Sequence, residues 1–211
     1  MRLLRSFAVF ATLLLVLPSN LWAAPLLIDF ESLSDLSAVT TQFPGVAFSN
    51  ATVLVAGSTL NELETPPHSG SNVVFDDGGP ISIDFTTPFL SFGGFFTYST
   101  PITLTAFDAS NNILGSTTSA FGSNFALSGD PGSNPNEFLH LSFAAGVTTL
   151  VIGGEPSGGS FVLDDAILET ETIVPPVPEP IVLSLLASAL GASMCRKRQS
   201  RGAGPRVDQA Q

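Results

Sequence analysis

Apolar and polar residues alternate with a period of two in several segments of the chain's middle part. In residues 81–85, three apolar side chains share one face of an extended segment and two polar side chains share the other, and residues 138–143 repeat the pattern. This alternation is typical of half-buried β-strands. Turn-forming clusters of Gly, Pro, Asn and Asp separate the segments, at 77–80, 110–112, 129–136 and 153–159. We therefore predict an all-β domain of about ten short antiparallel strands, a β-sandwich of the jelly-roll type.

The first 23 residues have the layout of an export signal. Residues 1–6 carry two arginines, residues 7–17 are a continuous apolar run, and a Pro-Ser-Asn break precedes the small pair Ala23-Ala24. This is the order of a secretory signal peptide, and we expect cleavage after Ala23. The alternative is an uncleaved anchor, for which an eleven-residue run is too short.

The C-terminal end carries a second apolar block. Residues 173–180 form a proline-rich linker that suits neither a helix nor a central strand. Residues 181–194 are apolar, and Cys195 with the snorkelling basic side chains after it extends them toward the length of a membrane span. Arg196, Lys197 and Arg198 should hold this end in the cytoplasm. We predict a transmembrane helix over 181–195, a cytoplasmic tail over 196–211, and an exported domain over 24–172.

The order of these C-terminal features resembles a known sorting signal. Pro178, Glu179 and Pro180 precede the short apolar helix and the basic cluster, an arrangement similar to the PEP-CTERM signal of exported bacterial proteins. The resemblance implies recognition by an exosortase, a membrane-embedded cysteine transpeptidase, and release to the cell surface, extracellular matrix or biofilm. This helix has fewer leucines than is usual, and residues 199–211 continue past the arginines. The alternative is a plain tail anchor after an incidental proline linker.

Charge is distributed unevenly along the chain. No lysine or arginine occurs between Ser6 and Cys195, whereas 17 of the 18 acidic residues fall in that stretch. A nucleic-acid-binding protein needs clustered cations to neutralise phosphates, so this class is excluded. The single cysteine, Cys195, excludes a disulfide within the chain and a cysteine-based metal site.

The acidic residues near the two ends of the predicted domain suggest a metal. Short phrases such as 28–31 and 161–165 resemble galactose-binding-like and carbohydrate-binding sandwiches, in which the first and last strands approach each other and acids from both often hold a structural calcium ion. Independently, acids that lack Lys or Arg partners suit a hard divalent ion, and one of the adjacent Asp164 and Asp165 must point inward. We predict calcium held by Asp29 and Glu31 with Asp164 or Asp165. The alternative is that these are solvated acids at strand ends.

Three classes of function remain open from the sequence. We favour a non-catalytic surface or matrix protein that is not an enzyme. The second class is a calcium-dependent carbohydrate-binding module with exopolysaccharide as its partner, and the third is a secreted hydrolase, for which no Gly-x-Ser-x-Gly motif is present. Sugar-binding modules commonly stack sugars on exposed aromatic rings, but Trp22 leaves with the predicted signal peptide. We expect Phe92, Phe95 and Phe96 to form a buried central strand; the alternative is that they form an aromatic platform beside Gly93 and Gly94.

Overall fold

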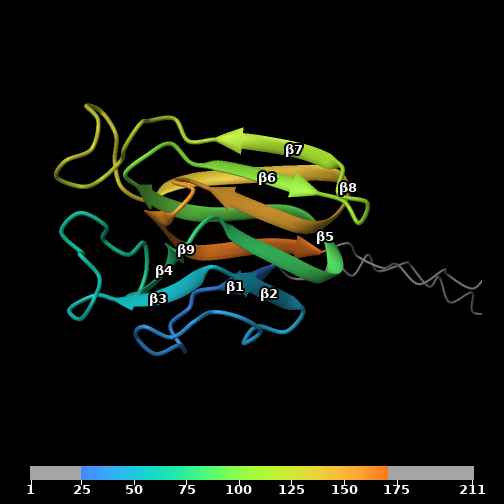
Figure 1. Cartoon of the computed structure of the whole chain (residues 1–211), viewed down its shortest axis with the longest axis horizontal. Coiled ribbons are helices and arrows are strands. Elements are labelled where there is room, and N and C mark those ends of the chain that lie inside the picture. Colours follow the sequence, from blue (N-terminus) through green and yellow to red (C-terminus); the bar gives the residue numbers. More distant parts are fainter. Residues whose placement is uncertain (1–24, 171–211) are drawn as a thin grey trace, which may run out of the picture. The chain divides into compact units, whose positions relative to one another are not determined.

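Nine strands make up the fold, and every ladder between them is antiparallel (Figure 1). The structure is a computed structural model that describes residues 25–170, and no helix occurs among them. In chain order the strands are β1 (Leu26–Ile28), β2 (Val46–Ser49), β3 (Ala51–Val55), β4 (Asn72–Asp77), β5 (Ile81–Tyr98), β6 (Thr103–Phe107), β7 (Ile113–Thr118), β8 (Glu137–Gly153) and β9 (Gly158–Thr170).

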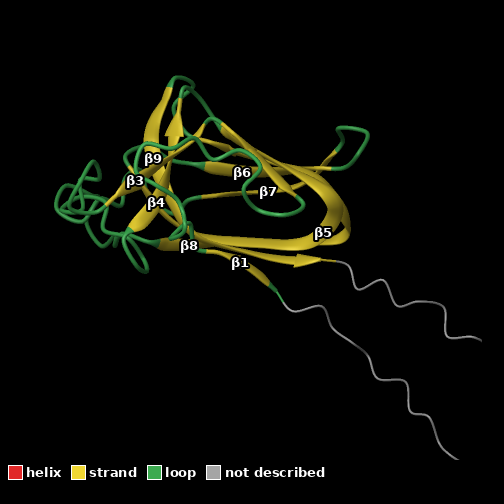
Figure 2. Ribbon diagram, turned by 90° about the horizontal axis from the view of Figure 1, so that it is seen from below, coloured by secondary structure: helices red, strands yellow, loops and turns green. Residues whose placement is uncertain are grey.

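The strands form the two layers of a sandwich, and β5 and β8 belong to both. Residues 89–98 of β5 pair with β9 and with the first part of β8, in the layer that also holds β4, β3 and β1. Residues 81–85 of β5 pair with β2 and with the last part of β8, in the layer that continues to β6 and β7. Figure 2 shows the bend by which β5 passes from one layer to the other. The all-β sandwich predicted from the sequence is therefore confirmed.

The bend in β5 has a local cause. Pairing between β5 and β8 is interrupted between Asp84 and Phe89, and this gap contains Pro88, which has no N–H to donate to a ladder. A second register irregularity lies between Phe89 and Ser91. Strands commonly turn the corner of a sandwich at such irregularities. The sequence pattern suggested about ten short strands, and this was wrong in one respect: β5, β8 and β9 are long, with 18, 17 and 13 residues.

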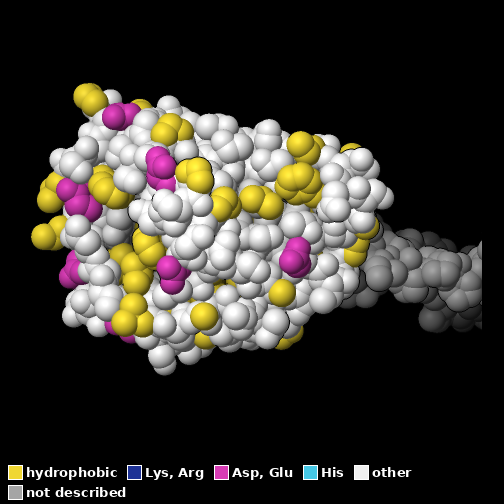
Figure 3. All heavy atoms as spheres, viewed as in Figure 1, with side chains coloured by type: hydrophobic (Ala, Val, Ile, Leu, Met, Phe, Trp, Pro, Cys, Tyr) yellow, Lys and Arg dark blue, Asp and Glu magenta, His cyan; other side chains and the backbone are white. Residues whose placement is uncertain are grey.

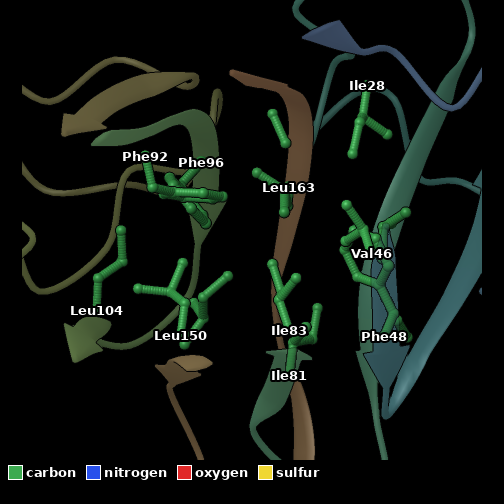
Figure 4. Close-up of a cluster of buried hydrophobic side chains, with 14 of the residues drawn as sticks. Ile28, Val46, Phe48, Ile81, Ile83, Phe92, Phe96, Leu104, Leu150 and Leu163 are labelled. Atoms are coloured by element: carbon green, nitrogen blue, oxygen red, sulfur yellow. The ribbon is translucent and has the colours of Figure 1, made fainter. Parts of the chain in front are cut away.

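The core lies between the layers and is built from the alternating apolar positions. Ile81 and Ile83 are buried, as are Phe92 and Phe96 farther along β5. Figure 4 shows these side chains with Leu104, Leu150 and Leu163, which come from β6, β8 and β9. Each such side chain contributes roughly 1.5–3 kcal/mol by its removal from water. Period-two alternation therefore predicted the inward faces of these strands correctly.

The two chain ends of the described domain lie together. β1 pairs with β9 through Leu26↔Leu168, Leu27↔Ile167 and Ile28↔Ala166. The approach of the first and last strands, which the resemblance implied, is confirmed. None of the residues from 25 to 170 forms a helix that could cross a bilayer. The predicted signal peptide over 1–23, linker over 173–180, membrane helix over 181–195 and tail over 196–211 lie outside the described residues.

A glycine at the start of β9 tests this packing. Gly158 has φ of 78°, and a Cβ there would lie 2.5 Å from the backbone oxygen of Asp76. Gly132 has a similar φ of 87° but no atom within 4 Å of such a Cβ. We expect Gly158→Ala to lower the free energy of unfolding by about 1–3 kcal/mol more than Gly132→Ala, because only the former adds a backbone clash to the left-handed strain. Urea unfolding of both variants measures this, and equal losses would contradict it.

Candidate ligand-binding surface

Carboxylates in this fold bind backbone N–H groups. Asp76 Oδ1 accepts hydrogen bonds from the N–H groups of Ser160 (2.8 Å) and Phe161 (2.9 Å), and Oδ2 accepts one from the Ser160 hydroxyl. Burial raises the pKa of Asp76. On the surface, the side chain of Asn112 and nearby N–H groups lower the pKa of Asp108. Backbone amides thus take the place of the Lys and Arg partners that this part of the sequence lacks.

Asp164 is a second enclosed carboxylate. Its side chain is 1% exposed, and its Oδ2 accepts from the N–H groups of His68 (2.7 Å) and Ser69 (2.9 Å). Its Oδ1 accepts from the N–H of Asp165 at 2.7 Å. Burial, together with the neighbouring charge of Asp165, outweighs these hydrogen bonds and raises the pKa of Asp164 to about 6.

Asp165 forms the only ion pair of the described residues. Its Oδ2 lies 2.6 Å from Nδ1 of His68, and its Oδ1 accepts from the Ser69 hydroxyl at 3.0 Å. We expected one of the two aspartates to point inward, whereas both are buried. The reason is local: Asp165 has φ of 46° at a register shift between β5 and β9, so consecutive side chains do not alternate there.

The four predicted calcium ligands do not converge. Asp29 is exposed, and its Oδ1 accepts from the N–H of Glu31. Glu31 Oε1 accepts from the N–H groups of Ser71 (2.9 Å) and Asn72 (2.8 Å). Glu31 and Asp164 therefore hold neighbouring parts of the same segment, 68–72. Within residues 25–170, no three side chains of His, Cys, Asp or Glu are placed to share a metal ion. Calcium stays a prediction, and the function proposed below does not depend on it.

A row of rings, which we call the aromatic shelf, lies beside this acidic pair. It consists of His68, Phe95, Phe138 and His140. The His68 ring stacks on Phe95 with centroids 3.4 Å apart and planes 9° apart. The ring centroid of Phe95 lies 5.0 Å from that of Phe138, and the centroid of Phe138 lies 6.1 Å from that of His140. Phe138 is 47% exposed, and the His68 side chain is 37% exposed.

Strand pairing positions the shelf. Phe95 on β5 pairs directly with Phe138 on β8 and with Asp164 on β9, and Gly93 pairs with His140. A Cβ on Gly93 would lie 2.6 Å from Cζ of Phe138, so the missing side chain leaves the space that the Phe138 ring occupies. The shelf therefore stands on a paired sheet and is held at one end by the ion pair between His68 and Asp165.

The structure corrects one expectation about β5. Phe92 and Phe96 are buried as expected, but Phe95 is only partly buried and points to the opposite face, where it contacts His68. The sequence around Phe95 did not indicate an exposed face, because segment 92–96 is Phe-Gly-Gly-Phe-Phe and shows no alternation of apolar and polar residues. The alternation in 138–143 did place His140 and Ser142 outward, and both are exposed. Phe138 lies two residues before His140, so the same alternation places its ring on the outward face, and this was the available signal for an exposed aromatic ring.

A cavity of about 210 Å³ is a second candidate for a ligand-binding site. Its walls include Phe75, Phe125, Val162, Glu64 and Thr65. Two of its polar side chains already have partners: Glu64 Oε2 accepts from the N–H groups at 127 and 128, and the Thr65 hydroxyl donates to the backbone oxygen at 61. The shelf offers exposed ring faces and less fully bonded polar groups, so it is the stronger candidate for a ligand.

The solved structures that resemble this chain share little sequence with it. No family model matches the chain, and no curated protein matches it. Among solved structures, it is similar to the K2 adhesin domain of Lys-gingipain, with 16% identity, a TM-score of 0.45, and coverage of 70% of this chain and 100% of that one. A DUF4465 family protein from Bacteroides caccae is 12% identical with a TM-score of 0.47, and the match covers 70% of this chain and 100% of that one. A family 35 carbohydrate-binding module from Clostridium thermocellum is 14% identical with a TM-score of 0.34, and the match covers 71% of this chain and 100% of that one. Similarity at this level says nothing about what the chain binds.

The pKa of Asp164 predicts a pH-dependent stability. Because its pKa in the folded state, about 6, exceeds its ordinary value of 3.8, the folded protein retains a proton that the unfolded chain releases between these values. The contribution of Asp164 to the free energy of unfolding is therefore largest below pH 4 and falls as pH rises through 6. We expect Asp164→Asn to cost about 2 kcal/mol more at pH 4.5 than at pH 7.5, measured by urea unfolding. A cost independent of pH would contradict this.

Proposed function

We propose that the chain is an exported, non-catalytic surface protein whose sandwich binds glycans on the aromatic shelf. The observation that carries the proposal is the exposed Phe138 ring, which continues the stacked pair of His68 and Phe95 on the outer face of a sheet. A sugar ring presents apolar C–H groups on its faces and hydroxyl groups at its edge. Flat aromatic surfaces with polar groups at their margins suit both features.

Polar groups are present at both ends of the shelf. His140 and Ser142 are exposed at one end, with the His140 Nε2 and the Ser142 hydroxyl 3.4 Å apart. At the other end lie the His68 ring and the Ser69 hydroxyl, both hydrogen-bonded to Asp165. These groups can donate to or accept from sugar hydroxyls, which would fix the orientation of a ring stacked on Phe138.

The arrangement of His68 favours binding over hydrolysis. A histidine oriented by an aspartate is two thirds of a Ser-His-Asp constellation, and such a constellation also needs a nucleophile beside the other ring nitrogen. Among the described residues, the only hydrogen bond of the His68 ring is the one to Asp165. The ring face instead lies on Phe95. We therefore assign the pair a positioning role within the shelf.

Removal of the exposed ring tests this proposal. We expect Phe138→Ala to weaken glycan binding at least tenfold, because stacking on one ring contributes on the order of 1 kcal/mol or more and the variant also loses the contact with Phe95. Ile113→Ala is the matched control, since Ile113 is a 66% exposed apolar residue on β7, outside the shelf. Affinity electrophoresis through gels that contain neutral, anionic or cationic polysaccharides measures retardation of each protein. If no polysaccharide retards the wild type, or if both variants behave alike, the proposal fails.

The C-terminal features support a second part of the proposal, delivery to the cell surface through a PEP-CTERM signal. Glu179 stands between two prolines directly before the apolar block of 181–194. We expect Glu179→Ala to leave an unprocessed full-length species in the membrane fraction, whereas Glu171→Ala, eight residues upstream, should mature normally. Immunoblots of membrane and extracellular fractions distinguish the two. Normal maturation of the Glu179 variant would rule out sorting through this motif.

A further inference from the structure

The described part of the chain carries negative charge without fixed positive charge. Residues 25–170 contain fifteen Asp and Glu and no Lys or Arg. Figure 3 shows one face of the molecule, on which acidic side chains are spread over the surface and no Lys or Arg appears. A ligand that approaches this domain therefore meets a potential of a single sign, and sugars that bear carboxylate or sulfate groups are repelled before contact.

The shelf contains no Lys or Arg, and one of its two histidines is paired with an acid. His68 is the one ionisable base beside Phe95, and its Nδ1 is already paired with Asp165 at 2.6 Å. Behind this pair lies the second carboxylate, Asp164, which forms hydrogen bonds to three backbone N–H groups. The pair of His68 and Asp165 therefore adds no net positive charge to the shelf. His140, at the far end, is the second histidine of the shelf, and its Nε2 lies 3.4 Å from the Ser142 hydroxyl.

We infer that the aromatic shelf selects glycans without negative charge, and that a carboxylate or sulfate group on the stacked sugar unit prevents binding. The inference rests on the proposed function, because it assigns the class of glycan to the same surface. A polymer with one anionic group per sugar places several like charges within a Debye length of about 8 Å from the domain's carboxylates. We expect such a polymer to bind at least tenfold more weakly than its neutral counterpart.

Cationic polymers provide a useful contrast. A polymer of protonated amino sugars is attracted to acidic side chains all over the domain, so its binding should be salt-sensitive and should not need the shelf. A neutral glycan that stacks on Phe138 should instead be insensitive to salt and depend on that ring. Salt dependence and ring dependence together therefore separate selection at the shelf from general charge attraction.

The experiment compares one polysaccharide in two charge states. The full-length protein, in a polyoxyethylene detergent that carries no sugar, is run through gels containing each neutral polysaccharide that retards it, and through gels containing the same polymer with its primary hydroxyls oxidised to carboxylates. Wild type and Phe138→Ala are compared at 20 mM and at about 300 mM salt, where screening shortens the Debye length. Glycol chitosan serves as the cationic probe.

We expect oxidation to abolish retardation at low salt and high salt to restore part of it. We expect glycol chitosan to retard the wild type and Phe138→Ala equally. One outcome would contradict selection by charge: the oxidised polymer retards the wild type as strongly as the neutral polymer does, and Phe138→Ala abolishes retardation by both polymers. Glycan binding at the shelf would then still stand. If no neutral or anionic polymer retards the wild type, the proposed function itself fails.

Discussion

The hydrogen bond from a backbone N–H to a carboxylate is the interaction on which this domain depends. Fifteen carboxylates share residues 25–170 with no Lys or Arg, so each buried one must find another donor. Asp76 joins β4 to the start of β9 through two N–H groups, and Asp164 joins β9 to the segment at 68–69 through two more. Such charge-assisted hydrogen bonds are stronger than neutral ones. They replace ordinary salt bridges and attach irregular segments to the sheets.

The segment 68–72 illustrates the consequence for the surface. Asp164 and Asp165 bind one end of it, and Glu31, just beyond β1, binds the other through the N–H groups of Ser71 and Asn72. Between them, Gly70 has φ of 54°, and a Cβ there would lie 2.3 Å from Cδ of Glu31. Only glycine allows the carboxylate to approach so closely. The position of the His68 ring over Phe95 therefore follows from acids on β9 and just beyond β1, two strands that pair with each other.

The sequence predicted the general architecture better than it predicted the site. Alternation at 81–85 and 138–143 is a local property, and it identified the inward faces correctly. The length of β5 and its bend depend on Pro88 and on pairing with strands far along the chain, which local alternation does not encode. Phe95 faces outward by plain alternation between the buried Phe92 and Phe96, but local alternation does not encode that this outer face of β5 is only partly covered. Calcium stays a prediction, and the sequence did not reveal that backbone amides bind Glu31, Asp76 and Asp164.

The same constraint links stability to the selectivity that we propose. A domain that satisfies its carboxylates with its own amides needs no cations in its interior, and it can therefore present a surface with a potential of one sign. Affinity for the neutral glycan that we propose must then come from ring faces and uncharged polar groups, such as the ring of Phe138 and the nearby Ser142 hydroxyl on β8. The pair of His68 and Asp165 contributes both to the network of bonded carboxylates and to the shelf, since it holds segment 68–72 in place and forms one end of the shelf. Loosening this pair would thus disturb the binding surface before it disturbed the core between the two layers, which draws its stability from apolar burial.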